Sequence, residues 1–180
     1  MAVDLTALVE QAEAFGFSHA GPLDASTLEP RDEVRDMCAA GKCKGYNSCW
    51  ACPPGCGTLE EMTTMMSAYK TGLIVQTTAE LEDEFDFEAM REASAQQRTR
   101  FMAFREVLEK QWPTLIALGS GGCKRCEACT WPDAPCRFPE QIVTSMEAAG
   151  LLVSDVCAKN GMAYYYGKNT LTYTSCYLLE

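Results

Sequence analysis

Eight of the eleven cysteines in this chain of 180 residues fall into two compact sets. The first set comprises Cys38, Cys43, Cys52 and Cys56, and the second comprises Cys123, Cys126, Cys129 and Cys136. Four cysteine thiolates are the usual protein ligands of one iron–sulfur cluster, and also of one structural zinc ion. Each set therefore carries enough thiolates for one metal centre.

The spacing of the second set favours an iron–sulfur cluster. It reads Cys-x2-Cys-x2-Cys-x6-Cys-Arg-Phe-Pro, close to the bacterial ferredoxin run, which has x3 before its last cysteine. The insert from Trp131 to Pro135 carries two prolines that stiffen the return of the fourth thiolate. Zinc is the alternative, although zinc sites more often combine two Cys-x2-Cys pairs or include histidine. The only histidine, His19, is far from both sets in the sequence.

Three cysteines lie outside the two sets: Cys49, Cys157 and Cys176. Free cysteine is usually a small buried apolar residue, and this is the role predicted for Cys157 and Cys176. Cys49 lies within the first set, and the pattern Cys49-x2-Cys52-x3-Cys56 resembles part of the ferredoxin run. Cys49 is therefore an alternative ligand that competes with Cys38.

Basic residues accompany both sets although the formal net charge is -10. They are Lys42 and Lys44 beside Cys43, Lys124 and Arg125 between Cys123 and Cys126, and Arg137 after Cys136. Cations near an anionic cluster would stabilise its reduced form, whereas the alternative is that they are solvated loop charges.

The overall charge and the hydrophobic pattern exclude several classes of protein. An excess of acidic residues disfavours a surface that binds nucleic acid or anionic membranes. No apolar run approaches 18 residues, so no membrane span is expected, and the N-terminus does not resemble a secretory signal. We therefore expect a cytoplasmic protein, in a reducing compartment that disfavours disulfides and favours metal thiolates.

Helices and strands are both predicted, which indicates an α+β (mixed α/β) fold in a single domain spanning residues 1–180. The predicted helices span about 5–15, 30–39, 58–69, 86–112 and 139–149. The predicted strands span about 17–22, 72–77 and 114–118, followed by a hairpin of 162–166 and 171–178. The first cysteine loop (38–57) and the second cysteine loop (121–139) then each precede a helix, whose N–H groups would face an anionic site.

A glycine-rich turn, Gly119-Ser120-Gly121-Gly122, leads into the second cysteine loop. It matches neither of the common phosphate-binding patterns, because it lacks both the Gly-Lys-Ser/Thr ending and the three-glycine dinucleotide spacing. We interpret its glycines as giving the backbone room around a cluster.

The two cysteine loops resemble those of a known family, domain of unknown function 2284, described as cysteine-rich predicted metal-binding proteins. The resemblance rests on the stretches Cys-Pro-Pro-Gly-Cys, Cys-Lys-Arg-Cys-Glu-Ala-Cys and Ser-Met-Glu-Ala-Ala-Gly and extends to the tail Tyr-Tyr-Tyr-Gly-Lys-Asn-Thr. The family positions that this chain matches are Cys38, Cys43, Tyr46, Cys52, Pro53, Pro54, Cys56, Cys123, Cys126, Cys129, Cys136, Arg137, Pro139, Ser145, Met146, Glu147 and Gly150. Cys49 departs from the family pattern, which more often has a polar or basic residue there. The resemblance implies a two-part cysteine framework that holds iron–sulfur clusters.

The sequence thus predicts an iron–sulfur protein that binds two [4Fe-4S] clusters through the two cysteine sets. Its expected role is single-electron transfer with a redox partner protein or a small-molecule electron acceptor, and its isolation is expected to need anaerobic conditions. One alternative is an enzyme that activates a small substrate at an open iron, with Cys49 or Tyr46 beside it. Another alternative is a zinc-stabilised interaction module.

Overall fold

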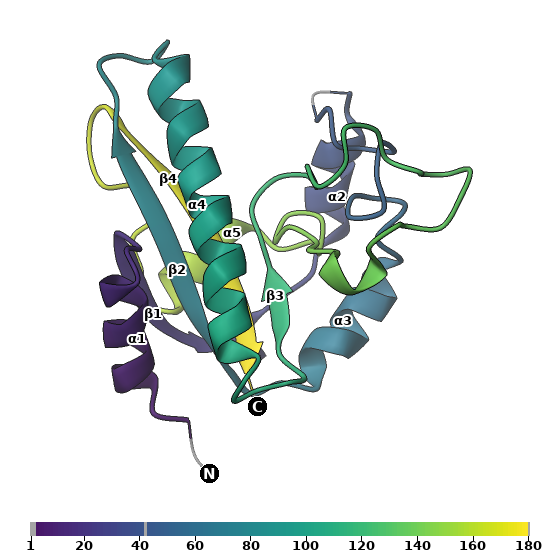
Figure 1. Cartoon of the computed structure of the whole chain (residues 1–180). Helices are drawn as coiled ribbons and strands as arrows, with labels where there is room; N and C mark the ends of the chain where they lie inside the picture. The colour runs from purple at the N-terminus through teal and green to yellow at the C-terminus, as the bar shows by residue number, and fades with distance from the viewer. Residues whose placement is uncertain (1–2, 42, 180) are drawn as a thin grey trace.

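The computed structural model describes residues 3–41 and 43–179, and over these residues it contains a four-stranded antiparallel sheet with helices on both faces (Figure 1). The helices are α1 (Leu5–Ala14), α2 (Asp32–Ala39), α3 (Leu59–Ser67), α4 (Phe87–Leu108) and α5 (Val153–Lys159), with the short 3-10 helices η1 (Ala25–Thr27) and η2 (Pro139–Gln141). The strands are β1 (His19–Asp24), β2 (Thr71–Glu80), β3 (Ile116–Leu118) and β4 (Thr170–Leu179), in the order β1-β2-β4-β3. The predicted α+β fold is confirmed.

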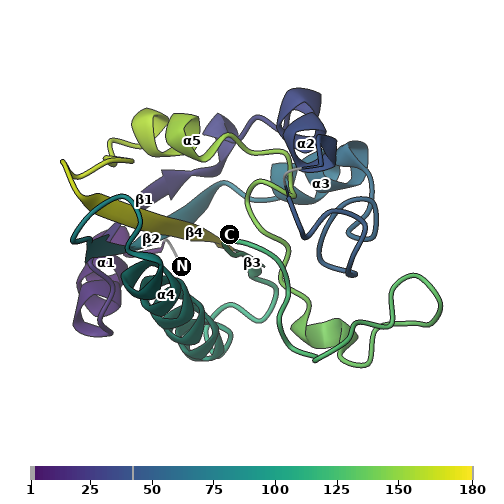
Figure 2. The same ribbon diagram turned by 90° about the horizontal axis from the view of Figure 1, so that it is seen from above.

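The central strands are buried on both faces, because each face of the sheet packs against its own set of helices. Leu73 and Val75 of β2 point into one core with residues of α1 and α4, while Ile74 points into the other with residues of α3 and α5. This alternation follows from the two-residue period of a strand. Figure 2 shows α1 and α4 on one side of the sheet and α5 on the other.

Capping residues fix the ends of several predicted elements. Thr58 and Glu61 form a capping box at the start of α3, each side chain accepting from the backbone N–H of the other. Asp86 caps α4, whose last helical residue is Leu108 rather than the predicted Trp112. The helix predicted to end near Cys38 is α2, which carries that cysteine in its last turn.

The predicted helix over 139–149 is wrong. Only Pro139–Gln141 is helical, as the 3-10 helix η2, and the chain then extends alongside the end of β3. The Gly119 N–H donates to the Thr144 carbonyl at 2.9 Å, and the Met146 N–H donates to the Gly119 carbonyl at 3.0 Å. Pairing with Gly119, the residue that follows β3, satisfies backbone groups that a helix would otherwise satisfy. The second cysteine loop is consequently not followed by an α-helix.

The predicted hairpin of 162–166 and 171–178 is also wrong, because only its second arm is a strand. β4 pairs with β2 and β3, and the segment 162–166 is joined to the sheet through the side chain of Gln76. The Gln76 amide donates to the Ala163 carbonyl at 2.9 Å and accepts from the Tyr166 hydroxyl at 2.6 Å. Helix α5, which precedes this segment, was not predicted.

The two cysteine loops lie side by side at the β3 edge of the sheet. The first joins α2 to α3 and the second follows β3, and both views show them together, away from α1 (Figures 1 and 2). No helix within the described residues is long and apolar enough to cross a membrane.

Candidate metal centre

The first cysteine set is partly buried. Cys38 and Cys56 are half-buried, Cys52 is buried and Cys43 is exposed. Cys38 is close enough to Cys43 for their thiols to interact, and burial, together with this neighbour, raises the pKa of the Cys38 thiol. Burial also raises the pKa of Cys52, which lies near Cys49, Cys43 and Cys56. Cys43 therefore links Cys38, at the α2 end of the loop, to Cys52 and Cys56, at its α3 end.

Consecutive turns wind the first cysteine loop so that its thiols lie close together. The Cys52 N–H donates to the Cys49 carbonyl at 3.2 Å, and the Cys56 N–H donates to the Cys52 carbonyl at 3.1 Å. A hydrogen bond that spans more residues, from the Asn47 N–H to the Pro53 carbonyl at 2.8 Å, closes the loop. These bonds satisfy the backbone locally, so that the loop needs few contacts with the sheet.

Gly45 lets the backbone approach two thiols of the first set. A Cβ at this position would lie 3.0 Å from the Cys52 sulfur and 3.5 Å from the Cys43 sulfur. A side chain here would push into the space between the two sulfurs. Gly122 of the second loop approaches the same Cys52 sulfur, at 3.5 Å from the equivalent Cβ position.

Arg35 of α2 holds the end of the first loop in place. Its guanidinium donates to the Gly57 carbonyl at 2.7 Å and the Ala148 carbonyl at 3.0 Å, and it lies 3.7 Å from the Cys56 sulfur. Burial raises the pKa of Cys56, while the charge of Arg35 partly offsets this by favouring the thiolate. The sequence analysis missed Arg35, whose only signal was its position one turn before Cys38.

All four cysteines of the second set line one small cavity. Cys123, Cys126, Cys129 and Cys136 share this cavity with Cys49 of the first loop. Apolar side chains from Trp50, Phe138 and Ile142 form part of its wall, and Arg125 and Arg137 provide positive charge. The four cysteines of the second set thus share the lining of one cavity, and their role as ligands stays a prediction.

Cys129 lies in an environment that favours the thiolate. Although burial raises the pKa of Cys129, the backbone N–H groups of Trp131, Trp50 and Thr130 and the charge of Arg137 outweigh it, so that the net shift is downward. Arg137 is itself held by donation to the Ala128 carbonyl at 2.9 Å. Because Trp50 belongs to the first loop, both loops contribute to the thiolate environment of Cys129.

Cys49 is the cysteine that lies between the two sets. Its side chain is 6% exposed and packs with Cys52 and Cys129. It also lies close enough to Cys56 and Cys123 to raise the pKa of each thiol, after the larger effect of burial. The sequence could place Cys49 in the first loop, but not beside the second set.

Two tryptophans fasten the cysteine loops to each other. The Trp50 indole donates to the Ala134 carbonyl at 3.1 Å, and the Trp131 indole donates to the Asn47 side chain at 3.0 Å. Their rings meet edge to face with centroids 4.7 Å apart. This reciprocal contact links residues far apart in the sequence, and its only sequence signal was a tryptophan in each loop.

The arrangement falls short of a preformed site for a single ion. Over residues 3–41 and 43–179, no three histidine, cysteine or acidic side chains are grouped so that they could hold one metal ion. Lys44, Lys124, Arg125 and Arg137 are exposed beside the cysteines, while Lys42 lies outside the described residues. Cys157 and Cys176 are completely buried in the core, as predicted, and the ligand roles of the two sets stay a prediction.

Comparison with protein families gives one result. A family model described as "Predicted metal-binding protein (DUF2284)" matches residues 21–179, which include both cysteine loops. Comparison with curated proteins and with solved structures gave no match.

Proposed function

Because this chain belongs to the DUF2284 family of predicted metal-binding proteins, we propose that it binds two [4Fe-4S] clusters and transfers single electrons. Cys38, Cys43, Cys52 and Cys56 would hold one cluster, and Cys123, Cys126, Cys129 and Cys136 would hold the other. The partner in electron transfer would be a redox protein or a small-molecule acceptor.

The observation that carries the proposal is the convergence of the second set on one cavity lined by sulfur and by apolar rings. The donor set fits an iron–sulfur cluster, since all its members are cysteines. The histidine His19 lies in β1, at the sheet edge opposite β3 and the loops, where it stacks on Tyr166. Soft thiolate donors are typical of iron–sulfur clusters and of zinc. The third closely spaced cysteine in the second set favours the cluster.

The charges around the second set also suit a cluster. A cluster with four thiolate ligands is anionic, and when bound it supplies a centre that accepts and releases one electron at a time. Arg125 and Arg137 lie at the cavity, and backbone N–H groups stabilise the Cys129 thiolate. Donors and cations of this kind raise the reduction potential, because they favour the more negative reduced state.

The proximity of the two sets suits transfer between clusters. Cys49 packs with Cys52 of the first set and with Cys129 of the second. The contact between Trp50 and Trp131 keeps the two loops together. An electron that enters at one set therefore has a short route through packed side chains to the other.

Free thiols agree with a cytoplasmic location for the proposed activity. All eleven cysteines are free, and none of them forms a disulfide. Proteins rich in unpaired thiols are typical of reducing compartments, where metal binding is favoured over disulfide formation.

One further feature favours a second candidate function, the activation of a small substrate at an open iron. Cys123 lines a cavity of about 850 Å³ between the second loop and α4, in addition to the small cavity shared with the rest of its set. A volume of this size is typical of small-molecule sites.

Reduction of the anaerobically isolated protein tests the proposal. We expect visible absorption that bleaches on reduction, a paramagnetic signal in the reduced protein, and uptake of about two electrons per chain, one for each cluster. A colourless protein that takes up no electrons would contradict electron transfer and would favour the zinc-stabilised interaction module.

A further inference from the structure

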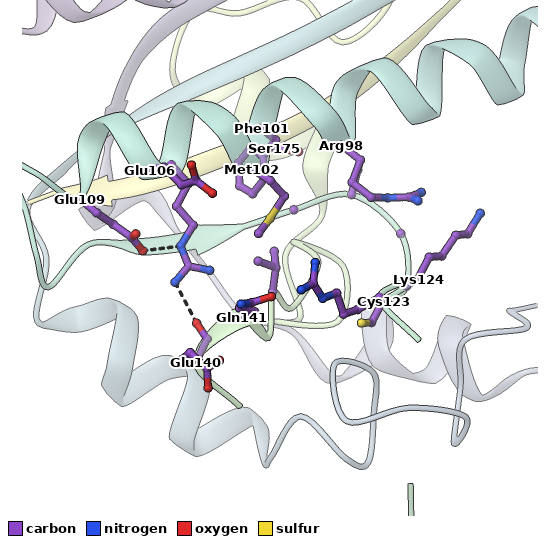
Figure 3. Close-up of a pocket in the computed structure, with 17 residues that line it drawn as sticks. Arg98, Phe101, Met102, Glu106, Glu109, Cys123, Lys124, Glu140, Gln141 and Ser175 are labelled. Atoms are coloured by element: carbon purple, nitrogen blue, oxygen red, sulfur yellow. Dashed lines mark hydrogen bonds and ion pairs between the residues drawn. The ribbon is translucent and has the colours of Figure 1, made fainter. Parts of the chain in front are cut away.

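A second, larger cavity beside the second cysteine loop has an uneven distribution of charge. It lies between α4, the turn 119–122 and the second cysteine loop, and its volume is about 850 Å³ (Figure 3). Figure 3 shows Arg98, Cys123 and Lys124 at one end, and Glu106 and Glu109 at the other. Arg105 at the acidic end is already neutralised, because it contacts Glu109 at 2.6 Å.

The cations at the cysteine end have no carboxylate partner within the described part of the chain. Neither Arg98 nor Lys124 takes part in any ion pair there. Arg125 lies 4.8 Å over the ring of Phe138, a contact that leaves its charge uncompensated. In a protein whose formal net charge is -10, three such cations around one cavity make a local anion-attracting region.

The glycine-rich turn adds backbone donors to this end of the cavity. Within residues 3–41 and 43–179, the N–H groups of Ser120, Gly121 and Gly122 donate no hydrogen bond to the backbone. Gly121 has a φ of +70°, and beyond its two chain neighbours no other residue has a heavy atom within 4 Å of where its Cβ would be. Successive N–H groups at a turn with a left-handed residue can form an anion-binding concavity even without a complete phosphate-binding motif.

Part of the cavity wall between its two charged ends is apolar. Phe101 and Met102 of α4 and Val143 line it, so the cavity offers an apolar surface beside its cationic end. Cys123, Arg125 and Gln141 line both this cavity and the small cavity of the second cysteine set. A molecule bound here would therefore lie next to the proposed metal centre.

We propose that this cavity binds a small organic anion, with its phosphate or carboxylate between Arg98, Lys124 and the 119–122 turn and its apolar part against Phe101 and Met102. The inference rests on the proposed function and deepens it, because it gives the chemical class of the small molecule that the second cluster would meet.

Calorimetric titration of the metal-loaded protein at low ionic strength, with butyl phosphate, butanoate and butan-1-ol as probes, tests the proposal. We expect saturable binding of one or both anions and no binding of the alcohol. The anion with the higher affinity shows whether the site prefers a phosphate or a carboxylate. The double variant Arg98→Gln/Lys124→Gln should bind about tenfold more weakly or worse, as expected for the loss of charge-assisted hydrogen bonds. Bound anion should also shift the paramagnetic signal of the reduced protein.

The matched control is Arg91→Gln/Lys168→Gln, which removes the same charge at residues that do not line the cavity. It should bind like the unmodified protein. Equal weakening in both double variants, or no saturable binding of either anion, would overturn the inference. Iron and sulfide are measured on the same samples: full clusters without anion binding refute the anion site alone, whereas anion binding to a zinc-loaded protein refutes the proposed clusters alone.

Discussion

Replacement of Cys126 by alanine should remove one cluster and about half of the iron, from roughly eight to roughly four atoms per chain. Cys126 lines the small cavity together with the other three cysteines of the second set. Loss of one of the four thiolates removes one bond to the cluster. It also loosens the other three thiolates, because metal binding is what organises such a loop. Iron and acid-labile sulfide per chain provide the measurement.

The rest of the protein should stay folded in this variant. The two cores on either side of the sheet contain no residue of the second loop, 121–139. Amide exchange should therefore increase over residues 121–139 first. Cys176→Ala is the control, since Cys176 is completely buried in the sheet and should leave the iron content unchanged. Full iron in Cys126→Ala would show that the assignment of the second set is wrong.

Cys38→Ala should also lose one cluster, whereas Cys49→Ala should keep both. Cys38 interacts with Cys43, and Cys43 in turn lies near Cys52, so these thiols form one group. Cys49 lies between the sets and would remain a free thiol beside both clusters. Its removal should therefore change the reduction potentials, through loss of a neighbouring dipole, more than the iron count.

Iron counts and low-temperature spin resonance of the two single variants decide between these assignments. The two changes remove the same group from the same part of the chain, so each variant is the control for the other. Loss of a cluster in Cys49→Ala with none in Cys38→Ala would reverse the assignment and make Cys49 the ligand.

Local signals in the sequence were sufficient for most of the helices. The capping box at Thr58 and Glu61 acts over three residues, so it could be recognised without knowledge of the fold. The strand β2 could be recognised from its continuous run of apolar and β-branched residues, which is typical of a strand buried on both faces. The signals that reveal these elements lie in neighbouring residues alone.

The errors arose where distant segments decide the local structure. The stretch after η2 has apolar residues at helical spacing, but its backbone pairs with Gly119, the residue that follows β3. Likewise, the segment 162–166 has the residues of a strand, yet the side chain of Gln76 in β2 hydrogen-bonds to the Ala163 carbonyl and to the Tyr166 hydroxyl. Tertiary hydrogen bonds of this kind leave no periodic pattern in the sequence.

In the candidate site too, features set by neighbouring residues could be predicted, whereas contacts between distant segments could not. Spacing grouped the cysteines of each set, because closely spaced residues on a short loop must lie close together. The contact of Trp50 with Trp131 and the position of Cys49 beside Cys123 depend on how the two loops pack. No spacing rule connects residues about 80 positions apart, so the proximity of the two sets could not be predicted from the sequence.

Iron, acid-labile sulfide and zinc counted per chain in an anaerobically isolated sample test the central claim most directly. Two complete sets of four thiolates predict about eight irons and eight sulfides per chain, with zinc in trace amounts only. Stoichiometric zinc with no acid-labile sulfide would contradict the proposal of iron–sulfur clusters.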